Sequence, residues 1–234
     1  SNLYHTYTYS KETMRGKSEL VQTGDAAKQT SSGLDRDYIT QWSYGIGETL
    51  TLLVPNFKGG ASVPLSQSET AMEKANPMYG GLYSQLTQYF GDQPMTSGPV
   101  YVGAFVLFLF ILGHFILEGP LKWALAGATL FSIVLAWGKN FMPLTDFFID
   151  YIPMYSKFRA VSSILVIAEF TIPLLAVFTL KRVLDEPDIL RRRKKAAGIS
   201  LLLTAGIALL LAVAPGIFSS TFVPAQEAQM LQNA

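Results

Sequence analysis

Asp35 and Asp37 are the first residues of this 234-residue chain whose types and spacing indicate chemistry. They flank Arg36, and because alternate side chains of an extended segment point to opposite faces, the two carboxylates would share one face. Two carboxylates on one face can hold a divalent cation or supply a general base. The alternative is structural, since acidic residues in loops often accept hydrogen bonds from the backbone. The catalytic residues and any metal stay open, with Asp35 and Asp37 as candidates and a divalent cation as the cofactor they would suit.

Lys157 and Arg159 form a second candidate site, for phosphate. They close an aromatic-rich segment, residues 139–159, which is expected to lie in a membrane interface with its rings at head-group depth. A guanidinium can bind two phosphate oxygens at once, and a neighbouring ammonium adds a point charge. The residue types leave two roles open, which are contact with a lipid phosphate and anchoring of the end of the apolar run that follows.

Two further polar side chains lie inside apolar runs. A carboxylate in the hydrocarbon core costs at least about 2.5–3.5 kcal/mol, so Glu169 is expected to face other helices or a water-filled cavity and to hydrogen bond there. A proton or ion relay is the alternative role of Glu169. His114 is expected to make a hydrogen bond between helices rather than to act in catalysis.

The composition is that of an integral membrane protein with a polar portion. Half of the residues are hydrophobic, 15% are charged, and the apolar residues cluster after residue 98. The net charge of +1 gives no case for a nucleic-acid partner. Because the chain has no cysteine, disulfide bonds, thiolate nucleophiles and cysteine-ligated zinc are excluded.

The elements that must position these residues are helices in a membrane. We predict a mainly α-helical, polytopic membrane bundle of about four transmembrane helices, with a mixed, loop-rich outer region. Residues 1–98 form the polar region, residues 99–218 the transmembrane region and residues 219–234 a tail. The spans are expected near residues 100–117, 123–138, 160–180 and 196–214.

The orientation follows from the basic stretch between the third and fourth predicted spans, because short loops rich in Lys and Arg stay in the cytoplasm. Residues 1–98 are then expected on the outer side, together with residues 139–159 and the tail. The alternative role of the basic stretch is to bind anionic lipid head groups. The residues that would anchor the topology are Lys181, Arg182, Arg191, Arg192, Arg193, Lys194 and Lys195.

Several motifs occur in an order that resembles a known family. They are Gly33–Tyr38, Gln41–Glu48, Pro55–Gly60, Gly91–Pro94, Gly98–Gly103, Trp137–Asn140 and Pro153–Arg159. On these motifs, nearly the whole chain resembles the YfhO-type integral membrane proteins of bacteria, particularly those of Bacteroides-like organisms. The chain would be an internal or C-terminal piece of such a protein.

That family resembles the GT-C glycosyltransferases, which are many-spanning inner-membrane proteins. The resemblance implies transfer of a sugar from a polyprenyl-phosphate donor to a cell-envelope acceptor on the outer face of the bacterial inner membrane. It also implies that Lys157 and Arg159 bind the donor phosphate, that residues 1–98 face the periplasm and that the catalytic acid lies earlier in the parent protein. The implied partners are the bilayer, the lipid-linked sugar and the remaining spans of the parent protein. A non-enzymatic transporter or a scaffold for envelope assembly is the alternative function.

Overall fold

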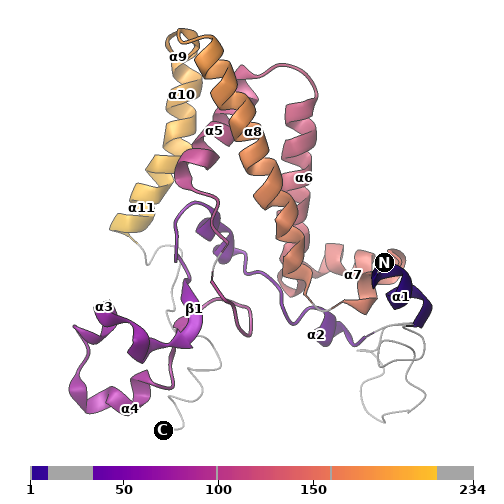
Figure 1. Ribbon diagram of the computed structural model, residues 1–234, viewed down its shortest axis with the longest axis vertical. Coiled ribbons are helices and arrows are strands. Elements are labelled where there is room, and N and C mark those ends of the chain that lie inside the picture. Colours follow the sequence, from indigo (N-terminus) through magenta and orange to yellow (C-terminus); the bar gives the residue numbers. More distant parts are fainter. Residues whose placement is uncertain (1, 10–33, 99, 159, 215–234) are drawn as a thin grey trace.

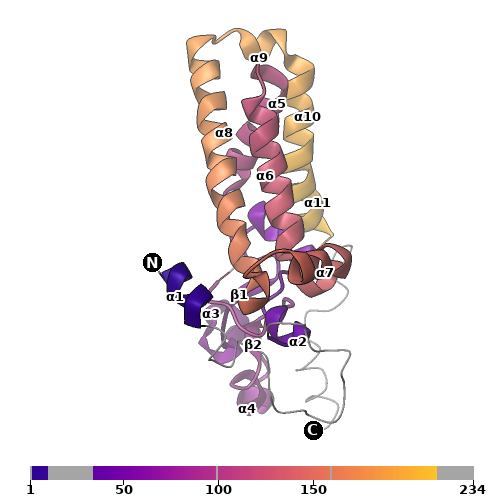
Figure 2. The ribbon, with the colours of Figure 1, turned by 90° about the vertical axis from the view of Figure 1, so that its right-hand side faces the viewer.

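The computed structural model describes residues 2–9, 34–98, 100–158 and 160–214 of the chain. Long apolar helices form a bundle, and a smaller polar region, residues 34–98, packs against one end of it (Figure 1). A view at right angles shows the same arrangement, with the long helices roughly parallel above the polar region (Figure 2). The opposite end of the bundle is called the far end below.

Three helices make the centre of the bundle. α8 (Val166–Asp185) packs against both α5 (Ala104–Ile116) and α6 (Leu121–Ala136). Gly113 of α5 makes a close approach possible, since it lies against Thr179 of α8. Small residues at helix contacts of this kind let two backbones approach closely.

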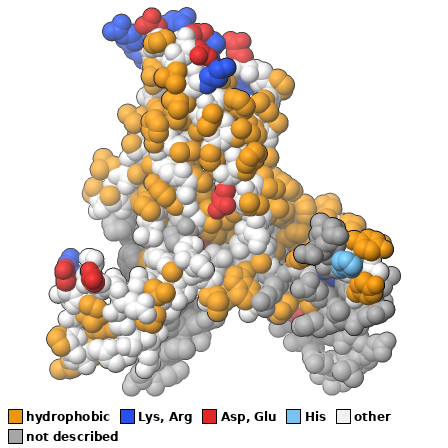
Figure 3. Space-filling view, in the orientation of Figure 1, with side chains coloured by type: hydrophobic (Ala, Val, Ile, Leu, Met, Phe, Trp, Pro, Cys, Tyr) orange, Lys and Arg blue, Asp and Glu red, His pale blue; other side chains and the backbone are white. Residues whose placement is uncertain are grey.

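The rest of the bundle follows a short turn at the far end. After α8 the chain passes through α9 (Ile189–Arg192) into α10 (Lys194–Leu201), which packs on α5. A π-helical segment, η8 (Leu202–Gly206), then leads into α11 (Ile207–Val213). Figure 3 shows charged side chains gathered over the far end and hydrophobic side chains over the sides of the bundle, which is the pattern of helices in a bilayer.

The prediction of about four transmembrane helices is wrong. Within the described residues, two helices are long and apolar enough to cross a membrane, Val161–Asp185 and Lys194–Val213. The number rises to three if α6 and the bent segment after it are one span. The two helices correspond to the expected spans near residues 160–180 and 196–214, although the first of them continues to Asp185.

The run at residues 100–117 fails as a span because its helix is short. Gly103 has a φ of +102°, outside the helical region, so α5 begins only at Ala104. Leu117 is already extended, which ends the helix at Ile116. At about 1.5 Å per residue, α5 is about 20 Å long, against about 30 Å for a hydrocarbon core.

The run at residues 123–138 ends in a sharp bend. Gly138 has a φ of +46°, a left-handed conformation that glycine adopts at little cost, and it opens η5 (Gly138–Phe141). The axis turns by 108° between α6 and the segment Gly138–Tyr151. As a result α7 (Met142–Tyr151) lies across the end of the bundle beside the polar region (Figure 2).

The polar region is built from short elements. Its two strands, β1 (Gly59–Pro64) and β2 (Thr87–Tyr89), pair antiparallel with a register irregularity between the pairs Gly59–Tyr89 and Pro64–Thr87. Its helical elements are α2 (Arg36–Ile39), η2 (Gly47–Leu52), η3 (Leu65–Gln67), α3 (Glu69–Met72), η4 (Pro77–Tyr79) and α4 (Gly80–Tyr83). A separate helix, α1 (Asn2–Tyr9), precedes them.

Apolar contacts hold the polar region on the bundle. Leu34 and Ile39 pack with Ile149 of α7 and with Val161, which opens η7 (Val161–Leu165) at the start of the first long span. In a second cluster Tyr44 packs with Ala136 and Leu165. The backbone N–H of Tyr44 donates to the carbonyl of Ala136 at 2.8 Å. The polar region is therefore fixed to the ends of α6 and α8.

Candidate functional site

Three segments that are far apart in the sequence meet where the polar region packs on the bundle. They are residues 43–48, residues 89–93 and residues 137–140. Trp137 holds the third segment beside the first, since its ring N–H donates at 3.0 Å to the hydroxyl of Thr49, the residue that follows the first segment. The polar side chains at this meeting point are called the junction site, and they are Glu48, Tyr89, Asp92, Lys139 and Asn140.

Glu48 is the buried centre of the junction site. Its side chain lies in the first turn of η2, and the residue is only 3% exposed. Oε1 accepts a 2.5 Å hydrogen bond from the hydroxyl of Tyr89. Oε2 accepts from the backbone N–H groups of Gly45 at 2.6 Å and Asp92 at 3.3 Å. Both carboxylate oxygens are thus used to join η2 to the segment after β2.

Burial raises the pKa values of both Glu48 and Tyr89. It raises the pKa of Glu48 above the ordinary 4.5, because removal from water disfavours the charged form, while the hydrogen bond from Tyr89 and those from the backbone act in the opposite direction. Burial also raises the pKa of Tyr89 well above its ordinary value, and the neighbouring Glu48 charge adds to that effect. Tyr89 therefore keeps its proton and serves as a donor.

The exposed part of the junction site carries the groups that can act on a ligand. The side-chain amide of Asn140 donates to Oδ2 of Asp92 at 3.1 Å and to the carbonyl of Tyr44 at 3.0 Å. The ammonium of Lys139 donates to the backbone carbonyl of Asp92 at 3.2 Å. Asp92 and Lys139 are both exposed, so a carboxylate and a cation face solvent next to each other.

Two glycines make room for this packing. A Cβ atom on Gly45 would lie 2.8 Å from Oδ2 of Asp92 and 2.9 Å from Oε2 of Glu48. A Cβ atom on Gly91 would overlap Oε1 of Glu48 and the hydroxyl of Tyr89. Gly45 and Gly91 are therefore required, because the backbone at both positions closely approaches the buried carboxylate of Glu48.

Asp35 and Asp37 have a different placement from the one the sequence predicts. The chain turns into α2 directly after Asp35, whose carboxylate accepts from the backbone N–H of Asp37 at 2.8 Å as a helix cap. The prediction that Asp35 and Asp37 lie in an extended segment, with both carboxylates on one face, is therefore wrong. Arg36 between them binds two acidic residues of α7, Asp146 and, at 2.9 Å, Asp150. The described ranges hold no group of three or more His, Cys, Asp or Glu side chains suited to a metal ion.

The predicted phosphate residues are only partly visible. Lys157 is half-buried at the end of η6 (Tyr155–Lys157), which follows α7 on the polar-region side of the bundle. Arg159 lies outside the described residues. Burial raises the pKa of the neighbouring Tyr155 to about 12. A phosphate site at Lys157 and Arg159 stays a prediction.

Glu169 and His114 both differ from their predicted settings. Glu169 lies in the first turn of α8 rather than at mid-span, because the regular helix begins only at Val166, and its side chain is exposed. The imidazole of His114 makes no hydrogen bond to another helix within the described residues. Its Nδ1 lies 2.8 Å from the carbonyl of Phe110 in α5 itself, and its buried Nε2 has no partner there. Its contact with α6 is instead an edge-on packing against Trp123.

The basic residues that are predicted to anchor the topology lie together at the far end. Lys181 and Arg182 close α8, and the five others lie in or beside α9 and the start of α10. The carboxylate of Glu186 binds Arg182 at 2.8 Å and Arg192 at 2.9 Å, which ties the turn together. Most of this charge is exposed.

The sequence analysis missed the residues of the junction site as a functional group. Its motifs Gln41–Glu48, Gly91–Pro94 and Trp137–Asn140 contain all of them except Tyr89. The available signal was the repeated pairing of glycine with a polar or charged residue in these motifs. That signal does not reveal that Glu48 and Asp92 touch across 44 positions.

Comparison of the chain with family models, with curated proteins and with solved structures gives no match. Within the described residues, the chain has two helices long and apolar enough to cross a membrane, or three if α6 and the bent segment after it are one span, and a polar region that closes over one end of the bundle.

Proposed function

We propose that the chain is part of a GT-C-like membrane glycosyltransferase, which takes a sugar from a polyprenyl-phosphate donor and transfers it to a cell-envelope acceptor. The observation that carries the proposal is the group of exposed Asp92 and Lys139 with half-buried Asn140 at the boundary between the polar region and the apolar helices. A polar acceptor and the phosphate of a donor with an apolar tail can meet at such a boundary.

In this reaction the bond between the sugar and the donor phosphate breaks, and a bond from the sugar to an acceptor hydroxyl forms. Asp92 takes the proton of that hydroxyl, a role worth about 10²- to 10⁴-fold in rate. Lys139 stabilises the negative charge of the departing lipid phosphate. Asn140 fixes the carboxylate of Asp92 through its 3.1 Å hydrogen bond. Asp92 replaces Asp35 and Asp37 as the acidic candidate, because the carboxylate of Asp35 is engaged as a cap.

The proposed location is the bacterial inner membrane, with the junction site on the periplasmic side. Support comes from the far end, where the basic residues between the two long helices favour the cytoplasm. The polar region packs at the opposite end, on the side where a lipid-linked donor of the outer leaflet would be reached.

The test is lipid-linked sugar turnover by the full-length protein in proteoliposomes, with a panel of polyprenyl-phosphate sugars. Asp92→Asn is expected to lower turnover by at least about 100-fold, and Lys139→Gln to lower it as well. Glu73→Gln and Lys74→Gln remove the same two charges from exposed positions of the same polar region and are expected to leave turnover unchanged.

Two results would contradict the proposal. Full turnover by Asp92→Asn would show that the carboxylate of Asp92 takes no part in sugar transfer. No turnover of any donor by the folded wild-type protein would favour the non-enzymatic alternative, a transporter or a scaffold for envelope assembly. A transporter is expected to pair charges within its helices. Glu169, the acidic residue inside the first long span, would then be the residue to test for a charged partner.

A further inference from the structure

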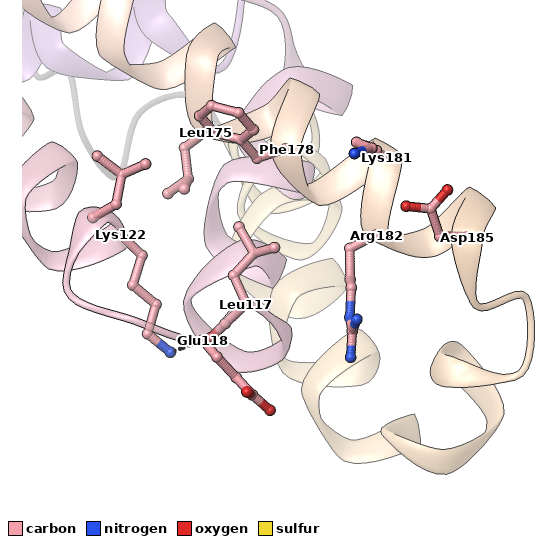
Figure 4. A pocket seen from close by; sticks show the side chains of 9 residues that line it. Leu117, Glu118, Lys122, Leu175, Phe178, Lys181, Arg182 and Asp185 are labelled. Carbon is pink, nitrogen blue, oxygen red and sulfur yellow. Dashed lines mark hydrogen bonds between the residues drawn. The ribbon is translucent and has the colours of Figure 1, made fainter.

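A pocket at the far end of the bundle is not used by the proposed reaction. Its volume is 310 Å³, at the lower end of the range of about 300–1,000 Å³ typical of small-molecule sites. The turn between α5 and α6 forms one side, and the last turns of α8 form the other (Figure 4). The pocket therefore lies where the apolar helices give way to the charged end.

The floor and the rim of the pocket differ in chemistry. Leu117, Leu121, Leu175 and Phe178 supply apolar surface, and Leu121 and Phe178 are 52% and 38% exposed. Figure 4 shows Leu175 and Phe178 at one side of the pocket and the charged ends of the rim residues away from them. Such apolar surface at the end of membrane helices faces the upper part of lipid acyl chains.

The rim carries more positive than negative charge. Its cations are Lys122, Lys181 and Arg182, and its acids are Glu118 and Asp185, so three positive charges against two negative leave one positive charge. Arg182 uses one nitrogen for Glu186, at 2.8 Å. A guanidinium has five N–H donors, so donors of Arg182 remain for a ligand.

Lys122 holds the rim in shape. Its ammonium donates to the carbonyls of His114 at 2.8 Å and Leu117 at 2.6 Å, which have no partners further along α5. Two of its three N–H donors are used in this way, and the third is left over. A cation is thus fixed beside the apolar floor rather than carried on a mobile side chain.

We propose that this pocket binds an anionic phospholipid of the adjacent leaflet, with the head-group phosphate on Lys181, Arg182 and Lys122 and an acyl chain along Phe178 and Leu121. The charge of the rim complements a phosphate, and Leu121 and Phe178 of the apolar floor are exposed to an acyl chain. Neither part alone would select a lipid, since a free phosphate needs no apolar floor and an uncharged lipid needs no cations. The site lies at the end of the bundle opposite the junction site and does not depend on sugar transfer.

The test measures binding of short-chain phosphatidylglycerol to the delipidated full-length protein in detergent by native mass spectrometry. Short-chain phosphatidylcholine and inorganic phosphate serve as the two comparison ligands. Phosphatidylglycerol is expected to bind at least about tenfold more tightly than either, because each basic residue near an anionic lipid adds about fivefold. Equal binding of the two lipids would overturn the proposal, and displacement of the lipid by equimolar inorganic phosphate would show a phosphate site instead.

Matched variants separate the pocket from the general charge of the far end. Lys181→Gln with Arg182→Gln is expected to weaken phosphatidylglycerol binding about 10- to 30-fold. Lys194→Gln with Lys195→Gln removes the same charge outside the pocket and is expected to change binding less than threefold; an equal loss would overturn the proposal. Glu186→Gln breaks the ion pair of Arg182 but keeps the guanidinium, so binding is expected to hold or to tighten. The lipid comparison on wild-type protein stands even if the double variant does not fold.

Discussion

The hydroxyl of Tyr89 donates a 2.5 Å hydrogen bond to Oε1 of Glu48 across 41 positions of sequence. Tyr89 ends β2 and Glu48 lies in η2, so this bond joins the sheet of the polar region to η2, whose Thr49 accepts a hydrogen bond from Trp137 at the end of α6. Because both groups are buried, neither can exchange its partner for water. The bond is therefore a structural link within the polar region, between its sheet and the helical turn next to the end of α6, and its loss has measurable consequences.

Replacement of Glu48 by alanine is expected to destabilise the polar region by about 2–3 kcal/mol. The variant leaves the hydroxyl of Tyr89 and the N–H of Gly45 buried without their acceptor. Glu48→Gln is expected to cost less, since its amide can donate to Tyr89 while its oxygen accepts from Gly45. Thermal unfolding of the detergent-solubilised protein, followed by tryptophan fluorescence, measures both. Equal losses for the two variants would contradict the assigned hydrogen bonds.

The buried carboxylate also predicts how stability depends on pH. The pKa of Glu48 is raised in the folded protein, so the folded state binds a proton more tightly than the unfolded state. The stabilisation from this group is fully present below the ordinary pKa of 4.5 and is lost as pH rises through the raised value. The midpoint of thermal unfolding is therefore expected to fall between pH 4.5 and neutral pH. Glu48→Gln should flatten this part of the curve, and an unchanged slope would contradict the assignment.

A third prediction concerns the contact of α5 with α8. A Cβ atom on Gly113 would overlap the hydroxyl of Thr179, whereas a Cβ atom on Gly127 of α6 would meet nothing within 4 Å. Gly113→Ala is expected to destabilise the bundle by about 1–3 kcal/mol through overpacking. Gly127→Ala is expected to be neutral or to stabilise it by up to about 1 kcal/mol, because alanine favours the helix. The stability of the two variants is compared by unfolding in mixed micelles that contain an increasing fraction of a denaturing detergent. Similar losses of stability at both positions would contradict the packing of Gly113 against Thr179.

The long helices show which parts of the fold are predictable from sequence. The charged stretch after Leu180 and the apolar run from Ala196 define two helices whose ends are displaced by only a few residues. The apolar run from Val100 was wrongly predicted to be a span, because hydropathy carries no information on backbone conformation. Gly103 adopts a positive φ and delays the start of α5, and Gly138 adopts a positive φ where the axis bends after α6.

The junction site could not be predicted from the sequence for a different reason. Glu48, Asp92 and Lys139 are separated by more than 40 residues at each step, and nothing local indicates that they meet. Asp35 was predicted to be a site residue because a second carboxylate, that of Asp37, lies two positions away in the sequence. Its role as a helix cap depends on where α2 begins, which the Asp-Arg-Asp pattern does not reveal.

The fourth prediction is the orientation of the bundle, and the absence of cysteine makes it directly measurable. Asp188 lies exposed in the turn of the far end, and Glu73 lies exposed in the polar region. Single cysteines at these positions, Asp188→Cys and Glu73→Cys, can be labelled with a membrane-impermeant maleimide in spheroplasts. Glu73→Cys is expected to react in intact spheroplasts, and Asp188→Cys only after permeabilisation, because the basic turn favours the cytoplasm. The reverse pattern would place the junction site in the cytoplasm and would remove the basis for a periplasmic sugar transfer.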